Sequence, residues 1–255
     1  MSYTSDFEGR GVVVTGAGSG IGRATALQFA SLGAKVLVAD IDPAGAQAVA
    51  KEIEANGGTA RTVVGDLSDQ ATAEEVITTA VESFGNLGVL VNNAGIMDHM
   101  AATADVSDAE WDRVIRINLT APFLLTRAAL PHMLARGNGA IVNTASEAGL
   151  RGSAAGTAYT VSKHGIIGLT KSTAVMYRDR GIRVNAIAPG GTQTHITDTV
   201  TFDGYGASIV GRYQENLGRI AAAEEVAAAI VFLASDAASN ISGAVLPVGD
   251  GWSAV

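Results

Sequence analysis

The chain has 255 residues, of which 47% are hydrophobic and 16% are charged, and its formal net charge is −8. This composition predicts a folded protein with a large core, and the length suits one α/β domain. The acidic balance argues against a nucleic-acid partner, because phosphate backbones are bound by clustered lysines and arginines.

The sequence also disfavours cysteine chemistry, a metal site, and secretion or insertion into a membrane. Cysteine is absent, which excludes disulfides and thiolate chemistry. The four histidines (His99, His132, His164 and His195) lack zinc-ligand spacing, so no metal site is expected. The N-terminal residues do not resemble a signal peptide, and no apolar stretch is long enough to span a bilayer. We therefore expect a cytoplasmic protein without a membrane partner.

Short apolar runs alternate with longer segments of helical periodicity, which is typical of βαβ units in a parallel sheet. Strands are predicted at residues 11–14, 35–39, 59–64, 87–91, 140–144, 183–188 and 244–248. Helices are predicted at residues 21–32, 44–55, 71–84, 107–136, 158–177 and 223–234. Residues 192–216 show no clear period, and no repeat or linker interrupts the chain. The pattern predicts one domain over residues 1–255, with a Rossmann-type doubly wound α/β sheet of seven mainly parallel strands flanked by helices.

A glycine-rich turn joins the first strand to the first helix. Its candidate cofactor contacts are Gly16, Ser19, Gly20, Ile21 and Gly22. Glycines let the backbone approach a pyrophosphate, whose charge the helix N-terminus stabilises. Glycine at three such offsets occurs by chance on the order of once in a chain this rich in glycine. The position between a strand and a helix is therefore what favours a dinucleotide site.

The second strand ends in Asp40, which indicates the type of dinucleotide. An acid at this point accepts hydrogen bonds from the ribose hydroxyls and repels a 2′-phosphate. Ile41 follows it, and the glycine turn holds no Arg or Lys, so no cation is at hand for NADP. The sequence predicts NAD as the cofactor, the alternative being that Asp40 is an ordinary loop residue.

Other candidate contacts follow the third and fourth strands. Asp66 and Leu67 come where adenine would rest, whereas Asn92, Ala94 and Gly95 come where the nicotinamide ribose would pass. Ligands of open parallel sheets bind beyond the carboxyl ends of the strands, at the switch point of the strand order.

A phenol and an ammonium group lie four residues apart at Tyr159 and Lys163, with Ser146 thirteen residues upstream of the tyrosine. These residue types can build a proton-transfer site for an alcohol or a carbonyl. A Tyr-x-x-x-Lys match is expected by chance only about 0.1 times in a chain of this composition. The alternative is a surface helix with an incidental Tyr–Lys pair.

With these motifs in order along its whole length, the chain resembles the compact, single-domain short-chain dehydrogenases/reductases. Residues 15–22 resemble that family's T-G-x-x-x-G-x-G turn, and residues 92–95 its N-N-A-G motif. The catalytic tetrad of the family is matched by Asn118, Ser146, Tyr159 and Lys163. Its P-G motif is matched by Pro189 and Gly190, and the I-T-G before its last strand resembles residues 241–243.

The chain departs from the family pattern in two places. Thr192 replaces the usual apolar residue two positions before Thr194, which keeps its place as a contact to the nicotinamide carboxamide. Residues 249–251 read Gly-Asp-Gly where the family has D-G-G. The first change alters the polarity of the pocket, and neither touches the chemistry.

The resemblance implies an oxidoreductase in which Tyr159 is the general base for alcohol oxidation and the general acid for ketone reduction. A free tyrosine titrates near pH 10, so Lys163 and the cationic nicotinamide are expected to lower its pKa. Ser146 would hold the substrate oxygen, and Lys163 would also bind the nicotinamide ribose. The resemblance further implies a homotetramer.

Asn118 and the polar neighbours of the tetrad allow more than one interpretation. Because Pro122 has no N–H, the Asn118 carbonyl four residues earlier could hold a water of a proton relay, or the proline could merely bend the helix. Glu147 could face the substrate or be an exposed surface residue. His164 is expected to be packed or exposed, and His195 is the better candidate for a substrate contact.

Residues 192–216 are expected to form a lid over the substrate, because long irregular segments of compact domains are usually functional. The candidate substrate contacts are Met97, Glu147, Leu150, His195, Phe202 and Tyr205. These walls predict an uncharged, partly apolar secondary alcohol or its ketone as the small-molecule partner.

Two alternatives to this function differ from it in testable ways. A 3-oxoacyl-carrier-protein reductase would prefer NADPH and a basic surface, and Asp40 and the net charge of −8 count against both. A catalytically silent NAD-binding regulator would have lost part of the tetrad, which is complete here.

Overall fold

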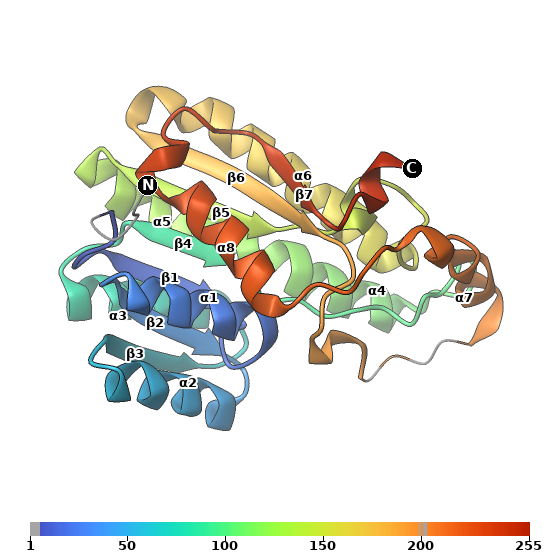
Figure 1. Ribbon diagram of the computed structural model, residues 1–255, viewed down its shortest axis with the longest axis horizontal. Helices are drawn as coiled ribbons and strands as arrows, with labels where there is room; N and C mark the ends of the chain where they lie inside the picture. Colours follow the sequence, from blue (N-terminus) through green and yellow to red (C-terminus); the bar gives the residue numbers. More distant parts are fainter. Residues whose placement is uncertain (1–5, 199, 201–202) are drawn as a thin grey trace.

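A parallel sheet of seven strands runs through the molecule (Figure 1), within the residues 6–198, 200 and 203–255 that the computed structural model describes. The strands are β1 (Gly11–Thr15), β2 (Lys35–Asp40), β3 (Thr59–Val64), β4 (Val89–Asn92), β5 (Gly139–Thr144), β6 (Ile182–Pro189) and β7 (Val245–Val248). Their order across the sheet is β3-β2-β1-β4-β5-β6-β7, and every pairing is parallel. The chain therefore builds outward from β1, then crosses back to lay β4 on its other side.

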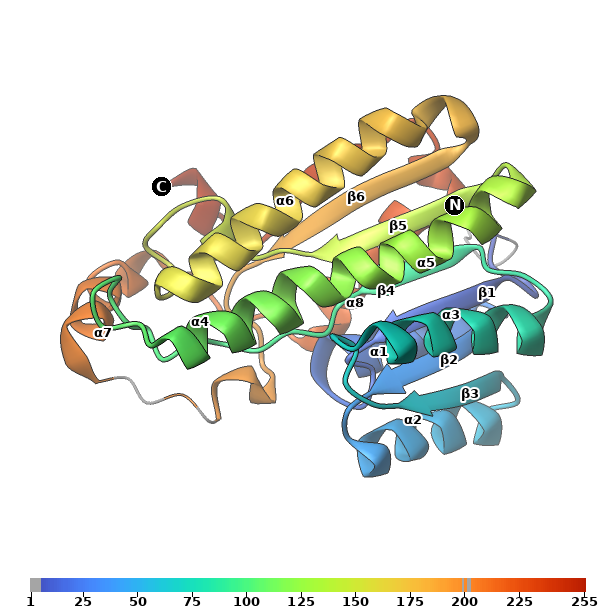
Figure 2. The ribbon, with the colours of Figure 1, turned by 180° about the vertical axis from the view of Figure 1, so that it is seen from behind.

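Helices cover both faces of this sheet (Figures 1 and 2). One face carries α1 (Gly20–Ser31), α2 (Pro43–Ala55) and α8 (Ala223–Ala234). The opposite face carries α3 (Gln70–Phe84), α4 (Asp108–Ile115), α5 (Ala121–Arg136) and α6 (Thr157–Tyr177). Each face has its own apolar cluster, because a strand covered on both sides presents alternate side chains to the two helical layers.

The central strands show why the sequence forms this sheet. All of β1 and all of β4 are buried, so their apolar residues read as continuous runs and not as an alternating pattern. Phe7, just before β1, packs edge-on against Phe29 of α1, with ring centroids 5.0 Å apart. The predicted fold class is confirmed, and the predicted strands and helices agree with the structure to within one or two residues at each end.

A π-helical turn interrupts the long helix that was predicted over residues 107–136. It spans Arg116–Thr120, between α4 and α5, and the backbone N–H of Ala121 donates to the Arg116 carbonyl five residues back. Pro122, directly after this turn, has no N–H to donate to a carbonyl four residues back. Such turns insert one extra residue into a helix and are frequent at functional sites. Asn118 lies in the middle of the turn.

The absence of regular structure that was predicted for residues 192–216 is wrong in part. The segment contains α7 (Gly204–Gly211) and two short 3₁₀ turns, His195–Thr197 and Gln214–Asn216. Helix α7 has glycines at both ends and little helix propensity, so its sequence gives no helical signal. Tertiary packing holds it instead, since Val210 is buried in a cluster with Met100 and Tyr159. Among the described residues, no helix combines the length and the apolar character that crossing a bilayer requires.

Candidate active site

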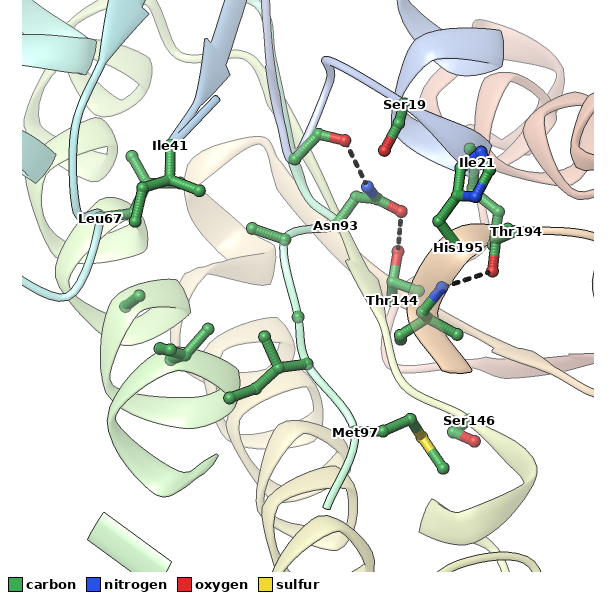
Figure 3. Close-up of a pocket in the computed structure, with 18 of the residues that line it drawn as sticks. Ser19, Ile21, Ile41, Leu67, Asn93, Met97, Thr144, Ser146, Thr194 and His195 are labelled. Carbon is green, nitrogen blue, oxygen red and sulfur yellow. Dashed lines mark hydrogen bonds between the residues drawn. The ribbon is translucent and has the colours of Figure 1, made fainter. Parts of the chain in front are cut away.

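A cleft of about 460 Å³ opens at the carboxyl ends of the strands (Figure 3). It is lined by most of the residues that the sequence assigned to the cofactor: Gly16, Ser19, Gly20, Ile21, Asp40, Asp66, Leu67, Ala94, Gly95, Tyr159, Lys163, Pro189, Gly190, Thr192 and Thr194. Ser146 of the tetrad also lines it, as do the predicted substrate contacts Met97 and His195. Ile196, a residue of the predicted lid, lines it too. Further lining residues were not predicted as contacts, among them Ile41, Ser68, Asn93, Ile96, Arg113, Ile117 and Thr144.

The glycine turn is held in place by the segment that follows β4. Asn93 donates from its side chain to the carbonyls of Thr15 and Gly16, at 3.0 and 3.3 Å. The hydroxyl of Thr15 accepts the backbone N–H groups of Asn93 and Ala94, at 2.9 and 3.1 Å. A Cβ at Gly16 would come 2.8 Å from the Cα of Ala94, so only glycine allows this approach. The turn and the N-N-A-G segment thus form one hydrogen-bonded unit.

Gly22 takes a structural place in this unit and does not line the cleft. A Cβ on it would overlap the Gly16 carbonyl and would lie 2.7 Å from the Asn93 side chain. It therefore lets α1 pack directly against the turn, which aims the helix N-terminus at the cleft.

The Asp40 carboxylate lies against the glycine turn. One of its oxygens accepts the backbone N–H of Gly18 at 2.7 Å, and the other accepts that of Asp42 at 2.9 Å. Each oxygen keeps a lone pair for a further donor, such as a ribose hydroxyl. Arg23, a cation on the first turns of α1, is bound by both oxygens of Glu52, at 2.9 and 2.7 Å. Its charge is therefore already paired within the protein.

The far end of the cleft from Ser146 is apolar on one side and charged on the other. Ile41 and Leu67 lie together there (Figure 3), and 70% of the Ile41 surface is exposed. Asp66 accepts a hydrogen bond from Ser68 at 2.6 Å and pairs with Arg116 at 3.1 Å. The hydrogen bond from Ser68, together with Arg116, lowers the pKa of Asp66. A flat apolar wall beside a carboxylate suits an adenine ring with its exocyclic amine.

Ser146, Tyr159 and Lys163 meet at the other end. Ser146 follows β5, whereas Tyr159 and Lys163 lie one turn apart on α6, where each is almost wholly buried. The side chains of Ser146 and Tyr159 line the same part of the cleft, and the Ser146 hydroxyl accepts the backbone N–H of Ala148 at 3.2 Å. The Lys163 ammonium donates to the carbonyl of Thr144 at 2.8 Å and lies 5.4 Å from the centre of the Tyr159 ring. Met97 lies beside Ser146 in the same part of the cleft (Figure 3).

Burial dominates the acid–base behaviour of this pair. It raises the pKa of Tyr159 to about 12, although the nearby hydroxyl of Ser146 works in the opposite direction. It also lowers the pKa of Lys163 to about 8. The sequence predicted a lowered pKa for Tyr159, and the protein alone does not provide it. Desolvation of Tyr159 and Lys163 favours the neutral form of each side chain. A phenolate here requires a further positive charge in the cleft.

Asn118 and Asn92 are buried outside the cleft lining, where they organise its walls. The side-chain amide of Asn118 exchanges two hydrogen bonds with the backbone of Ile96, both 2.9 Å long. Asn92 donates to Thr126 of α5 at 3.1 Å and to Asn143 of β5 at 2.8 Å. The first contact fixes the segment after β4, and the second ties α5 to the centre of the sheet.

Three further predicted substrate contacts, Glu147, Leu150 and Tyr205, do not line this cleft. Glu147 is fully buried and pairs with Arg151 at 3.5 Å. Burial raises the pKa of Glu147, with Arg151 acting in the opposite direction. Leu150 and Tyr205 are exposed and do not line the cleft, whereas Phe202 falls outside the described residues. Within the part of the chain that the structure describes, no group of His, Cys, Asp and Glu side chains could hold a metal ion.

Comparison with known proteins gives a consistent result. A family profile described as short chain dehydrogenase matches residues 10–203. The chain is 44% identical to a cis-4-hydroxycyclohexanecarboxylate dehydrogenase of Sinomonas cyclohexanicum, over 98% of each chain. It is 40% identical to a cyclohexanol dehydrogenase of Acinetobacter sp., over 94% of this chain and 93% of the relative. It is 39% identical to a 3-oxoacyl-(acyl-carrier-protein) reductase of Thermotoga maritima, over 96% of this chain and 98% of the relative.

Solved structures match the same extent of the chain. The crystal structure of levodione reductase superposes with a TM-score of 0.89 at 38% identity, covering 98% of this chain and 99% of that one. A protein from Beutenbergia cavernae, described as a putative NAD(P)-dependent gluconate 5-dehydrogenase with bound NADP at low occupancy, superposes with a TM-score of 0.86 at 42% identity. The match covers 97% of this chain and 98% of that protein.

Proposed function

This chain belongs to the short-chain dehydrogenase/reductase family, and from that premise we propose that it interconverts a secondary alcohol and its ketone with NAD(H). The observation that carries the proposal is that Ser146 and Tyr159 line the same cleft, with the Lys163 ammonium 5.4 Å from the centre of the Tyr159 ring. A phenol that opens on the same cleft as a serine hydroxyl is suited to exchanging a proton with an alcohol oxygen.

The cleft fits a dinucleotide cofactor by its shape and by its donors. Side chains on the glycine turn would crowd this end of the cleft. A Cβ at Gly18 would lie 3.0 Å from Asp40, and one at Gly20 would lie 3.1 Å from Thr194. Because both residues are glycines, this space stays free for a dinucleotide. Asp40 would bind the ribose hydroxyls of the adenosine, and Lys163 those of the nicotinamide ribose. The cofactor supplies the hydride acceptor or donor.

The protein's own part in the reaction is to hold the alcohol and to move its proton. Ser146 would orient the substrate oxygen toward the Tyr159 hydroxyl. Tyr159 would take the hydroxyl proton during oxidation and return it during reduction. The cationic ring of the oxidised cofactor would add the positive charge that the buried tyrosine needs, because an opposite charge lowers the pKa of an acid.

A cyclic secondary alcohol is the substrate class we propose. Met97, Ile96 and Ile196 give the chemistry end of the cleft an apolar wall, and two of the relatives are named for six-membered ring alcohols. One of these relatives is named for a ring alcohol that carries a carboxylate. Arg113, an exposed cation that lines the cleft, would suit such a carboxylate. The segment 192–216 is our candidate for the lid, because Thr192, Thr194 and Ile196 line the cleft.

Reduction of a 3-oxoacyl group is the second candidate, since one relative carries that activity in its name at 39% identity. The carboxylate of Asp40 and the net charge of −8 count against NADPH and against an acidic carrier protein. The homotetramer and the cytoplasmic location stay predictions from the sequence.

We expect NADH to appear when the protein is mixed with NAD⁺ and cyclohexanol, followed by its absorbance, and little product with NADP⁺. A matched pair of cyclohexanol and cis-4-hydroxycyclohexanecarboxylate would show whether the cleft prefers a neutral or an anionic ring. Consumption of NADPH with an acetoacetyl thioester, and no reaction of either ring alcohol, would replace our proposal by the second candidate.

The two directions of the reaction should respond differently to pH. Oxidation needs Tyr159 as phenolate, so kcat/KM should rise by about tenfold for each pH unit below the tyrosine pKa. Reduction needs the phenol, whose pKa burial raises to about 12, so its kcat/KM should stay level through the titration range of oxidation. Initial rates in both directions between about pH 6 and 9 test this. A flat profile for oxidation would mean that Tyr159 does not exchange the proton.

A further inference from the structure

Asp98 is a buried carboxylate that the proposed reaction does not use. It lies after β4, is 1% exposed and does not line the cleft. Its two oxygens accept three backbone N–H groups, from Met100 at 3.1 Å, Gly156 at 3.2 Å and Tyr159 at 2.9 Å. A carboxylate hidden from water needs such donors, because burial alone strongly disfavours its charge.

Two of these donors belong to the start of α6. The residue before that helix is Gly156, which has no side chain, so the helix cannot cap itself. The first N–H groups of any helix lack partners within the helix, and Tyr159 is the third residue of α6. Asp98 therefore performs from another loop what an Asp or Ser usually does at the N-cap position.

Gly156 and Asp98 fit each other closely. A Cβ on Gly156 would lie 2.5 and 2.7 Å from the two carboxylate oxygens, which is too close for any real contact. The absence of a side chain at position 156 thus makes room for the carboxylate at the helix end.

We propose that Asp98 is a positioning residue of this site, which caps α6 from the loop after β4 and so fixes the Tyr159 backbone beside Ser146. The same carboxylate places a negative charge against the backbone of Tyr159. Since a like charge disfavours the phenolate, Asp98 acts together with burial to raise the pKa of Tyr159. The inference rests on the proposed function, in which Tyr159 exchanges the proton.

Other charges face these two groups and have to be separated from Asp98 in a test. Lys163 lies beside the Tyr159 ring on the same helix. Glu110 of α4 acts on Asp98 and accepts the backbone N–H of His99 at 2.7 Å. Glu110 is therefore the matched control, because it is a second carboxylate that holds this same loop, whereas the N–H groups of Gly156 and Tyr159 are bound by Asp98.

The test compares three variants with the wild type in alcohol oxidation. Asp98→Asn keeps the shape of the side chain and removes its charge. We expect kcat to fall about tenfold and the midpoint of the pH profile of kcat/KM to move down by about one pH unit. Gly156→Ala keeps the charge and pushes the carboxylate away from the helix, so kcat should fall while the midpoint stays in place. Glu110→Gln should change neither quantity.

A merely structural role would leave the midpoint unmoved in every variant, and this result would overturn the electrostatic part of the proposal. Equal shifts in Asp98→Asn and Glu110→Gln would overturn it as well, since any carboxylate of the loop would then suffice. If Asp98→Asn does not fold, Gly156→Ala decides, and wild-type kcat in that variant would contradict the positioning role.

Hydrogen exchange at single amides supplies a readout without substrate. In Asp98→Asn the amides of Gly156 and Tyr159 should exchange at least about tenfold faster, while those of α5 keep their wild-type rates. Unchanged exchange at both amides would overturn the capping role even if no alcohol were ever found to react. A wild-type protein that is inactive with every alcohol and ketone, but shows this local change in the variant, would instead refute the proposed function alone.

Discussion

Tyr159→Phe is expected to lower kcat for alcohol oxidation by about 10³-fold, within the range of 10²–10⁴ that a positioned general base contributes. The substitution removes one hydroxyl and leaves the buried ring in its cluster with Met100 and Val210. KM for NAD⁺ should change little, because the assigned cofactor contacts of the glycine turn and of Asp40 remain. Steady-state kinetics with saturating cofactor measure both quantities.

Tyr177→Phe is the matched control for this loss. Tyr177 ends the same helix but does not line the cleft. Its side chain packs against the apolar cluster on that face of the sheet. We expect near wild-type kcat from it. The assignment of the base would be contradicted if Tyr159→Phe kept more than about a tenth of the wild-type kcat while binding cofactor normally.

The double substitution of Asp40→Ser with Ile41→Arg should reverse the choice between NAD⁺ and NADP⁺. Asp40 carries the charge that would repel a 2′-phosphate, and Ile41 beside it is 70% exposed, so an arginine there has room to reach that phosphate. We expect the ratio of kcat/KM for NADP⁺ to that for NAD⁺ to rise by about 10³-fold. That factor corresponds to about 4 kcal/mol, which is within reach of the lost ribose bonds, the relieved repulsion and one bidentate arginine–phosphate pair.

Asp42→Ser is the control for the cofactor experiment. Asp42 caps α2 through the backbone N–H groups of Ala44 and Gly45, and it does not line the cleft. Because serine caps a helix about as well as aspartate, this variant should keep its melting temperature and leave the cofactor ratio unchanged. A wild-type protein that already prefers NADP⁺ would contradict the reasoning from Asp40 before any variant is made.

The parts of the fold that could be predicted from the sequence are those whose signal is local. The strands of the sheet centre are short apolar runs between turns, and the helices between them have clear starts and stops, so their ends come out within one or two residues. The cofactor cleft was predictable for a related reason. Parallel strands bring their carboxyl ends to one edge, so Gly16, Asp40 and Gly95 had to gather there once the strands were known.

What could not be predicted depends on contacts between distant segments. Helix α7 is stabilised by packing and not by its own sequence, and the π-helical turn depends on how α4 and α5 join. Glu147 is a charged residue beside Ser146, and nothing in the sequence shows that Arg151 allows its burial. The high pKa of Tyr159 follows from desolvation, which the spacing of two residues on a helix does not reveal.

The order of the strands has a consequence for how proteins of this kind diversify. The end of the cleft that we assign to the adenosine is built from β1, β2 and β3 and the turns after them, whereas Ser146, Tyr159 and Lys163 follow β5 or lie on α6. The proposed cofactor-selecting and proton-transferring groups therefore come from separate stretches of the gene. Mutations around β2 can exchange the cofactor without disturbing the acid–base machinery, whereas the walls proposed for the alcohol, Ile96, Met97 and Ile196, draw on both halves of the chain.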